Sequence, residues 1–435
     1  MHLAEIFCDH MVLQRDKDIC IFGYGKGEGI IEFLGEKHTF TSDDDKFCVY
    51  LPPKTAGGPY EMQVTLNGNT TVLTDIMIGD VYIAAGQSNI EFTLAQTQEI
   101  DYYNNANIRF FTEPHNADEQ GNLIHNQADW FSCVDDKVNQ FSAIGYYFAN
   151  ELQSVINVPI GIISCSKGAS RVDAWTAPEY VTTKEYQKMQ EVRHNDYHYY
   201  KFNHDSWTYK NKLTNIIPFA NSGVLWYQGE SNRGNAEAVY YSKMLEVMIN
   251  NWRQEWNDNL PFYLVQLMPY NEDANIADWA KIRSQQELAS KTLPNVYMVT
   301  LVDTGEENEI HPQKKKTVAC ELANAVKNIQ FSLDIEYCGP ILEGYSILEN
   351  GLELHFSHAD GLCIKGKKLI DLHLFDKNNK SITFNERIKN KKLCLECENV
   401  RLVSKITLGY SNAPKHNLYN GSGFLASPFC LEKEG

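Results

Sequence analysis

Two polar stretches of the sequence carry the residue types used in nucleophilic catalysis. The first, Gly-Gln-Ser-Asn at 86–89, ends the apolar run 81–85. A serine at the carboxyl end of a strand can act as a nucleophile when a nearby base takes its proton. The alternative is that Ser88 only caps the helix that follows. Because Ile90 stands in place of a second glycine, the stretch does not match the G-x-S-x-G elbow of α/β-hydrolases.

The second stretch, DTGEENEIHPQKKK at 303–316, contains the candidate base His311. A general base needs a hydrogen-bonded acid that fixes its tautomer and stabilises the imidazolium. Glu309, two residues upstream, could reach the ring in a loop conformation. The alternative is a purely structural histidine.

Two further stretches offer donors for a developing oxyanion. The loop SCSKGASRVDAWT at 164–176 contains Gly168, which lets a backbone N–H approach a ligand oxygen. The stretch WYQGESN at 226–232 contains the amides of Gln228 and Asn232, and side-chain amides are effective oxyanion donors. The alternatives are an ordinary turn for the first loop and a helix cap for the second.

Apolar runs alternate with amphipathic helical patterns between residues 77 and 330. This alternation favours a parallel sheet with helices on both faces, that is, a doubly wound α/β fold. Such sheets bind ligands beyond the carboxyl ends of their strands, so the four polar stretches are expected to converge there. The expected strands are 81–85, 158–164, 222–229, 261–267 and 296–303, and the expected helices are 141–156, 238–256, 279–292 and 314–329.

Both ends of the chain consist of short β-type runs separated by Gly, Pro and Asp. A chain of 435 residues is also too long for one hydrophobic core. We therefore expect an N-terminal β-sandwich at 1–76, an α/β catalytic domain at 77–330 and a C-terminal β-rich domain at 331–435.

The composition excludes some classes of partner. A net charge of −17 argues against nucleic acid and anionic membranes, both of which require basic patches. No apolar run reaches the 18 residues of a membrane span. The eleven cysteines have no compact spacing, which favours reduced thiols, and the first residues lack the pattern of a signal peptide. A cytoplasmic location is expected, or a secreted or periplasmic one if a leader has been removed.

The order serine, glycine loop, amide stretch and histidine is that of SGNH-type (GDSL-type) hydrolases. The chain closely resembles the sialate O-acetylesterase family within that class. HMVLQRDK at 10–17 and AGGPYEMQV at 56–64 resemble the opening β-domain of the family. GDVYIAAGQSNIEF, GVLWYQGESN and EIHPQKKK resemble its catalytic blocks, and NAPKHNLYNGSGFLASPF at 412–429 is similar to its closing segment.

The resemblance implies a set of roles in a serine esterase. Ser88 is the expected nucleophile and His311 the base. The backbone N–H groups of Ser88 and Gly168, with an amide of Gln228 or, second, Asn232, are the expected oxyanion donors. No cofactor and no metal are implied.

Two positions depart from the family pattern. Glu309 stands where the family usually has aspartate, so either a longer acid completes the triad or Ser88 and His311 act as a dyad. Ala169 stands where the family has the second glycine of a pair.

Other side chains of the blocks are candidates for substrate contacts. Gln87, Asn89 and Glu230 lie within the blocks, and Arg171 and Arg233 follow two of them. An arginine could form a bidentate pair with a sialate carboxylate. The alternative for either arginine is an ordinary salt bridge.

The segment 193–210 is rich in His and Tyr. His194 and His198 have a spacing that can ligate a metal on a helix, but no third ligand accompanies them. We expect an aromatic lid, a sugar platform or a solvated connection, and no metal.

The sequence thus predicts an esterase that removes O-acetyl groups from a small carbohydrate or oligosaccharide, with O-acetylated sialic acid as the first substrate. One alternative is an acetylxylan or hemicellulose acetylesterase. Another is a carbohydrate-binding protein with weak catalysis, which the departure at Glu309 leaves open.

Overall fold

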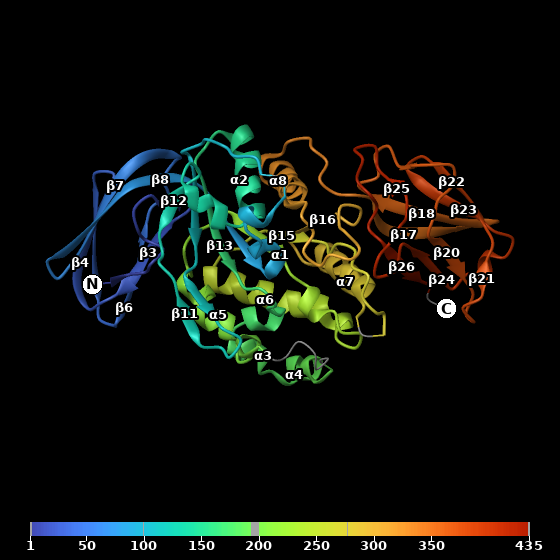
Figure 1. Cartoon of the computed structure of the whole chain (residues 1–435), viewed down its shortest axis with the longest axis horizontal. Coiled ribbons are helices and arrows are strands. Elements are labelled where there is room, and N and C mark those ends of the chain that lie inside the picture. The colour runs from blue at the N-terminus through green and yellow to red at the C-terminus, as the bar shows by residue number, and fades with distance from the viewer. Residues whose placement is uncertain (1, 99, 193–199, 276, 434–435) are drawn as a thin grey trace.

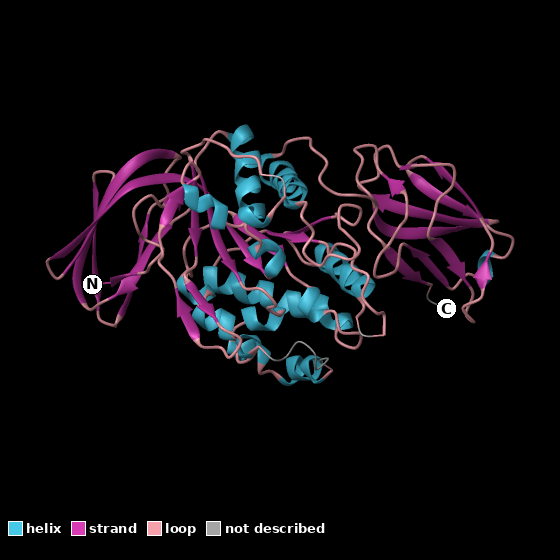
Figure 2. Cartoon of the chain, in the orientation of Figure 1, coloured by secondary structure: helices cyan, strands magenta, loops and turns pink. Residues whose placement is uncertain are grey.

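The computed structural model describes residues 2–98, 100–192, 200–275 and 277–433. At its centre lies a twisted sheet covered by helices on both faces (Figures 1 and 2). The strand order is β12-β9-β13-β8-β14-β15-β16. These strands are β8 (Asn69–Gly86), β9 (Ile108–Thr112), β12 (Trp130–Ser132), β13 (Ile160–Ser166), β14 (Gly223–Tyr227), β15 (Phe262–Val265) and β16 (Val296–Val299).

All of these strands run parallel except β12, which is antiparallel at the edge. In the register, Gly86 at the end of β8 pairs with Ser166 of β13 and with Tyr227 of β14. Three neighbouring strands therefore end at the same level. The polar stretches that follow them emerge side by side at one edge of the sheet.

Long helices cover the two faces of the sheet. On one face α2 (Ala143–Ile156) packs against α8 (Lys315–Phe331), and on the other α6 (Tyr241–Trp256) packs against α7 (Trp279–Thr292) (Figure 1). Because both faces are covered, β13, β14 and β15 are buried along their whole length, which explains their continuous apolar runs. The shorter helices are α1 (Ser88–Glu91), α3 (Pro178–Val181), α4 (Lys184–Glu191) and α5 (Trp207–Asn211).

The fold is thus a mixed α/β structure, as the sequence predicts. Helix α7 has the predicted bounds, and α8 begins one residue and ends two residues after the predicted range 314–329. Strand β9, between β12 and β13, is an addition that the sequence analysis did not foresee. No helix in the described ranges combines the length and apolar character needed to cross a membrane.

The N-terminal strands lie at the left of Figure 1. Strands β1, β3 and β6 form a separate three-stranded sheet, whereas β2, β4, β5 and β7 extend the central sheet through β8. Strand β8 is long enough to pair with β7 and β2 through its first half and with β13 and β14 through its second. The predicted boundary at 76/77 falls inside β8 and stays a prediction. The strands are β1 (His2–Leu3), β2 (Val12–Gln14), β3 (Ile19–Tyr24), β4 (Gly27–Phe33), β5 (Glu36–Ser42), β6 (Lys46–Leu51) and β7 (Gly57–Leu66).

A disulfide joins Cys20 of β3 to Cys48 of β6. The expectation of reduced thiols is therefore wrong for this pair. The two residues lie 28 positions apart and meet only because β3 and β6 are neighbouring antiparallel strands, which their spacing does not reveal. The other nine cysteines are free.

The C-terminal strands form two four-stranded antiparallel sheets, β17-β18-β23-β22 and β21-β20-β24-β26, and the pair β19-β25. Both large sheets contribute to one hydrophobic cluster that is separate from the central core. The strands are β17 (Ile341–Leu348), β18 (Gly351–Ser357), β19 (Cys363–Ile364), β20 (Leu372–Phe375), β21 (Ser381–Ile382), β22 (Asn385–Lys389), β23 (Lys392–Glu396), β24 (Lys405–Leu408), β25 (Leu418–Tyr419) and β26 (Phe429–Glu432).

The closing segment 412–429 contacts the central α/β part. The Asn412 side chain accepts a hydrogen bond from the backbone N–H of Trp279, at the start of α7 (3.0 Å). The hydroxyl of Ser427 accepts a hydrogen bond from Gln266 Nε2 (2.8 Å) and donates one to Glu287. These buried polar contacts fix the C-terminal strands against the α/β part.

Candidate active site

Ser88 and His311 meet at the carboxyl edge of the sheet. The Nε2 atom of His311 lies 2.8 Å from the Oγ atom of Ser88, although 223 positions separate the two residues. Ser88 is the first residue of α1, directly after β8, and His311 lies in the loop between β16 and α8. Both side chains are half-buried. A hydroxyl and an imidazole at this distance have the geometry that a nucleophile and its base adopt in acyl transfer.

Gly86 shapes the turn that presents Ser88. Its φ is +133°, and a Cβ atom there would lie 2.1 Å from the carbonyl oxygen of Tyr227. No side chain fits in that space. The N–H of Gln87 donates to the same carbonyl (3.0 Å), so the end of β8 is held against the end of β14 and the chain turns directly into α1.

The loop after β13 lies beside Ser88. A Cβ atom at Gly168 would lie 3.7 Å from Cβ of Ser88. Within the described residues, the backbone N–H groups of Ser88 and Gly168 donate to no protein acceptor. Ala169 adopts a left-handed φ of +60°, a conformation that favours glycine and explains the second glycine of the family pattern.

The amides of Gln228 and Asn232 belong to a buried network. Gln228 Nε2 lies within hydrogen-bond distance of Gln87 Oε1 (3.1 Å), the Ser170 carbonyl (3.1 Å) and Asn232 Oδ1 (2.8 Å). Asn232 Nδ2 donates to Glu237 (2.9 Å). Gln87 Oε1 also accepts from the backbone of Ser231 (3.2 Å). These side chains connect the three loops, and the amide donors of Gln228 and Asn232 are occupied.

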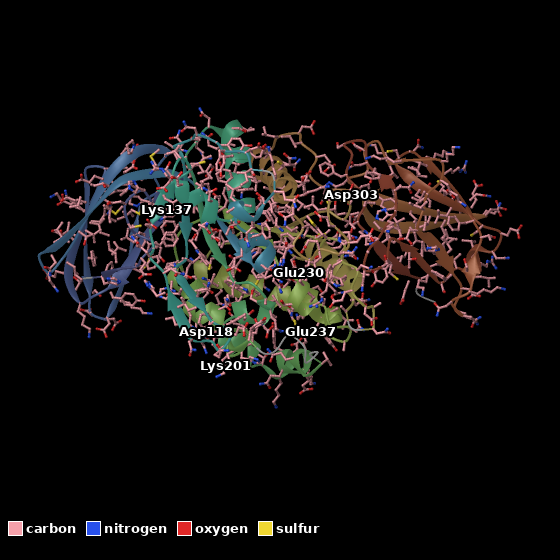
Figure 3. The ribbon with its side chains drawn as sticks, viewed as in Figure 1. Asp118, Lys137, Lys201, Glu230, Glu237 and Asp303 are labelled. Atoms are coloured by element: carbon pink, nitrogen blue, oxygen red, sulfur yellow. A yellow bond between two sulfur atoms is a disulfide. The ribbon has the colours of Figure 1, made fainter. Side chains whose placement is uncertain are left out.

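A second buried series of hydrogen bonds involves Asn89, the residue after Ser88. Asn89 Nδ2 donates to Glu230 Oε1 (2.6 Å) and to the carbonyl of Ile310 (3.0 Å), the residue before His311. Lys315 Nζ donates to Asn89 Oδ1 (2.5 Å). Figure 3 shows Glu230 near the middle of the molecule. These contacts link α1, which begins at Ser88, to the turn after β14 and to the loop that contains His311.

The sequence analysis did not foresee a role for Lys315. In the sequence, Lys315 stands out only as the middle one of three consecutive lysines, four residues after His311. In the structure it is the first residue of α8. Its ammonium group lies 4.7 Å from the centre of the Phe92 ring. Burial lowers the pKa of Lys315 to about 7, and burial raises the pKa of Glu230.

Glu309 binds the backbone of the histidine loop. Its Oε1 accepts a hydrogen bond from the backbone N–H of His311 (2.9 Å), and its side chain is exposed. In the described part of the chain, Nδ1 of His311 has no hydrogen-bond partner. The orienting bond that the sequence analysis considered between Glu309 and the ring is therefore absent in this state.

Burial lowers the pKa of His311, the positive charge of Lys315 lowers it further, and Glu309 opposes both. A general base must be neutral, so activity is expected to rise with pH as His311 loses its proton. Because its pKa lies below the ordinary value of 6.5, the acid limb of the kcat/KM profile is expected below pH 6.5.

Glu309→Gln is expected to shift this acid limb to lower pH, because the substitution removes a charge that raises the pKa of His311. We expect kcat at pH 8 to fall less than about 10-fold, since one backbone hydrogen bond changes and a neutral amide can still accept it. The check is a pH series on an aryl acetate, with Glu306→Gln, exposed in the same loop, as the control. A loss near 10³-fold would instead identify Glu309 as the acid of a triad.

Both arginines proposed for a substrate carboxylate are buried and paired. Arg171 is 1% exposed, donates to the carbonyl of Ser231 (2.7 Å) and pairs with Glu237. Arg233 is 3% exposed and pairs with Glu272. These partners hold the loops together. His194 and His198 lie outside the described residues.

In the described residues, one group of side chains has the geometry to hold a metal ion: Glu5, His115 and His125. It shares no residue with the loops around Ser88.

Three comparisons with known proteins place the chain in a family. Residues 78–328, more than half of the chain, match the family described as "Carbohydrate esterase, sialic acid-specific acetylesterase". The chain is 25% identical over 417 residues to sialate O-acetylesterases of Pongo abelii and Homo sapiens, which covers 84% of this chain and 78% of each relative.

The crystal structure of a carbohydrate acetylesterase from Xanthomonas citri superposes with a TM-score of 0.86 at 27% identity. The superposition covers 99% of both chains. The match of residues 78–328 to the family, together with this likeness over the whole fold, shows that the chain belongs to the family of carbohydrate esterases described as sialic acid-specific acetylesterases.

Proposed function

We propose that this esterase removes O-acetyl groups from sialic acids, with Ser88 as nucleophile and His311 as general base. The observation that carries the proposal is the 2.8 Å contact between Ser88 Oγ and His311 Nε2. The substrate class is supported by the relatives from Pongo abelii and Homo sapiens, which are sialate O-acetylesterases.

In the proposed reaction, His311 takes the proton of Ser88 while Oγ attacks the acetyl carbonyl carbon. The backbone N–H groups of Ser88 and Gly168 stabilise the oxyanion, because no protein acceptor occupies them in the described residues. The bond to the sugar oxygen breaks, and His311 returns the proton to that oxygen. Water, deprotonated by His311, then attacks the carbonyl carbon of the acetyl-enzyme. The bond to Ser88 Oγ breaks, His311 returns the proton to Oγ, and acetate is released.

The strand order supports an SGNH-type arrangement of the catalytic part. When β9 and β12 are left out, the remaining strands lie in the order β13-β8-β14-β15-β16. If these five strands are numbered along the chain, the spatial order is 2-1-3-4-5, which is a doubly wound pattern. The point where the winding reverses lies between β8 and β14. Ser88 follows β8 at that point, where ligands of such sheets bind.

Because Nδ1 of His311 has no partner in the described part of the chain, we propose that Ser88 and His311 act as a dyad. Gln228 and Asn232 then hold the loops in place, since their amide donors are already occupied. Both oxyanion donors in this scheme are backbone groups, which the sheet register positions.

Lys167 is the side chain that we propose for the sialate carboxylate. It precedes Gly168, is only half-buried, and donates to the carbonyl of Ala117 (3.0 Å). Its ammonium group lies 4.5 Å from the centre of the Phe202 ring. Arg171 and Arg233, by contrast, are buried against carboxylates.

The test compares hydrolysis of O-acetylated N-acetylneuraminic acid, acetylated xylo-oligosaccharides and an aryl acetate. We expect the highest kcat/KM on the sialate. Lys167→Ala is expected to raise KM for the sialate about 10- to 100-fold and to leave the aryl acetate unchanged, since one charge-assisted hydrogen bond contributes about 1.5–3 kcal/mol. Lys184→Ala, in α4, is the control.

Each arm can contradict part of the proposal. A preference for xylan fragments would replace sialic acid with a hemicellulose substrate. An equal effect of Lys167→Ala on both ester classes would remove the carboxylate contact but keep the esterase. A protein that binds the glycans and hydrolyses none of the three substrates would be a carbohydrate-binding protein without catalysis.

A further inference from the structure

Side chains from the two ends of a hairpin meet the N-terminal segment outside the active site. The hairpin consists of β10 (His115–Ala117) and β11 (Leu123–His125), and its register places His115 opposite His125. The two imidazole rings are 4.8 Å apart between centroids. Glu5, in the loop after β1, contacts His125 Nε2 through its Oε1 (2.9 Å).

One ligand atom from each of Glu5, His115 and His125 lies within 4.8 Å of the others. Two imidazoles and a carboxylate are the ligand set of many zinc sites, which bind the ion at about 2.0–2.2 Å. A bound ion would draw the three side chains closer together. His125 and Glu5 are partly exposed, so small side-chain rotations can bring this about.

A buried carboxylate contacts one of the two imidazoles. Glu113 Oε1 lies 2.9 Å from Nδ1 of His115, and Asn215 Nδ2 lies 3.0 Å from both atoms. The Glu113 side chain is fully buried, and Lys212 pairs with its other oxygen (2.9 Å). This contact leaves Nε2 of His115 as the ring nitrogen for an ion, and a carboxylate partner on the other nitrogen increases the basicity of a ligating histidine.

The second carboxylate oxygen of Glu5, Oε2, also favours a bound cation. Glu5 Oε2 is buried without a hydrogen-bond partner in the described residues, and its distance to His115 Nδ1 is 3.9 Å. A buried carboxylate oxygen without a partner is costly, and a cation would satisfy it. With neutral imidazoles, Glu5 and Glu113 contribute two negative charges against the single positive charge of Lys212, so the cluster attracts a cation.

We propose that Glu5, His115 and His125 bind a divalent transition-metal ion, with Zn²⁺ the best match to this ligand set. The adjoining cavity of about 410 Å³ is lined by His2, Glu5 and His115 among others, and leaves room for water as a further ligand. The ion joins the N-terminal segment to the hairpin. We assign the ion a structural role, because none of its three ligands belongs to the loops around Ser88.

The metal competes with protons for the same atoms. An imidazole must be neutral to bind a metal, so protons compete with the ion for the two histidines. Glu5, Glu113 and Lys212 are the charged groups that face the two rings. Zinc binding is therefore expected to weaken as the pH falls from 7.5 to 5.5 and to release protons on binding.

The test is calorimetric titration of Zn²⁺ into the tag-free full chain after treatment with a chelator and its removal. We expect one ion per chain at pH 7.5 and a higher thermal midpoint with zinc present. His125→Ala, on an exposed strand, is expected to abolish this binding. Glu113→Gln keeps all three ligands and is expected to weaken binding by about 10- to 100-fold.

His373→Ala is the matched control, since His373 also pairs with a carboxylate at an exposed position. We expect this variant to bind zinc as the wild type does, and all variants to keep their esterase activity on an aryl acetate. The proposal is overturned if the wild type binds no stoichiometric zinc, or if His125→Ala binds it unchanged. His115→Ala is also expected to abolish zinc binding. If this variant does not fold, His125→Ala and Glu113→Gln still test whether the cluster binds zinc.

Discussion

Ser88→Ala is expected to lower kcat on acetyl esters by about 10⁴- to 10⁶-fold, with KM changed only slightly. In the proposed reaction, Oγ of Ser88 forms the bond to the acetyl carbon, and no other group can replace it. The measurement is acetate release from an aryl acetate and from O-acetylated sialic acid. Ser422→Ala, at an exposed position, is the control.

His311→Gln is expected to produce a similar loss, because the amide cannot take the proton of Ser88. Since the two side chains act as a unit, the double variant is expected to lose no more activity than either single variant. Additive losses would mean that they act in different steps. If Ser88→Ala kept more than about 1% of the wild-type rate, the nucleophile would have to be another residue.

Lys315→Met is expected to lower kcat by about 10²-fold, because small displacements of reacting groups have effects of this size. Lys315 binds Asn89, the neighbour of Ser88, and Asn89 binds the backbone next to His311. Without the ammonium group, Asn89 Oδ1 loses its donor and the nucleophile helix loses one of its links to α8. Asn89→Ala is expected to show a loss of the same order.

The same variant is expected to shift the acid limb of the kcat/KM profile to higher pH. The charge of Lys315 lowers the pKa of His311, so its removal raises that pKa. With a pKa of about 7, Lys315 is mostly protonated over the range in which His311 titrates. The shift is opposite in sign to that of Glu309→Gln, and a loss of packing alone would not predict this pair of shifts.

Lys316→Met provides the matched control, because Lys316 is the next residue of the same helix and pairs with Asp101 at the surface (2.6 Å). It should leave both kcat and the pH profile unchanged. If Lys315→Met changed neither kcat nor the acid limb of the kcat/KM profile, the contacts of Lys315 would contribute only to the packing of α1 against α8.

Much of the α/β part could be predicted from local patterns. The alternation of apolar runs and helical periods predicted β13, β14, β15 and β16 within about four residues, because strands covered on both faces are apolar throughout. Of β8 it predicted only the last part, 81–85. The sequence analysis missed strand β9, because Ile108–Thr112 is short and no predicted helix separates it from β8. The disulfide between Cys20 and Cys48 was missed because it depends on the pairing of two strands.

The sequence by itself determined which residue types follow the ends of the strands, and the order of these stretches was enough to predict that Ser88 and His311 belong to one site. Only the tertiary structure decided what each polar side chain contacts. It placed Gln228, Asn232, Arg171 and Arg233 in buried networks, turned Glu309 toward the backbone, and brought Lys315 against Asn89. The physical reason is that hydrogen bonds act over about 3 Å. Whether a side chain faces the cavity or the core therefore depends on the register of strands and loops that lie far apart in the chain.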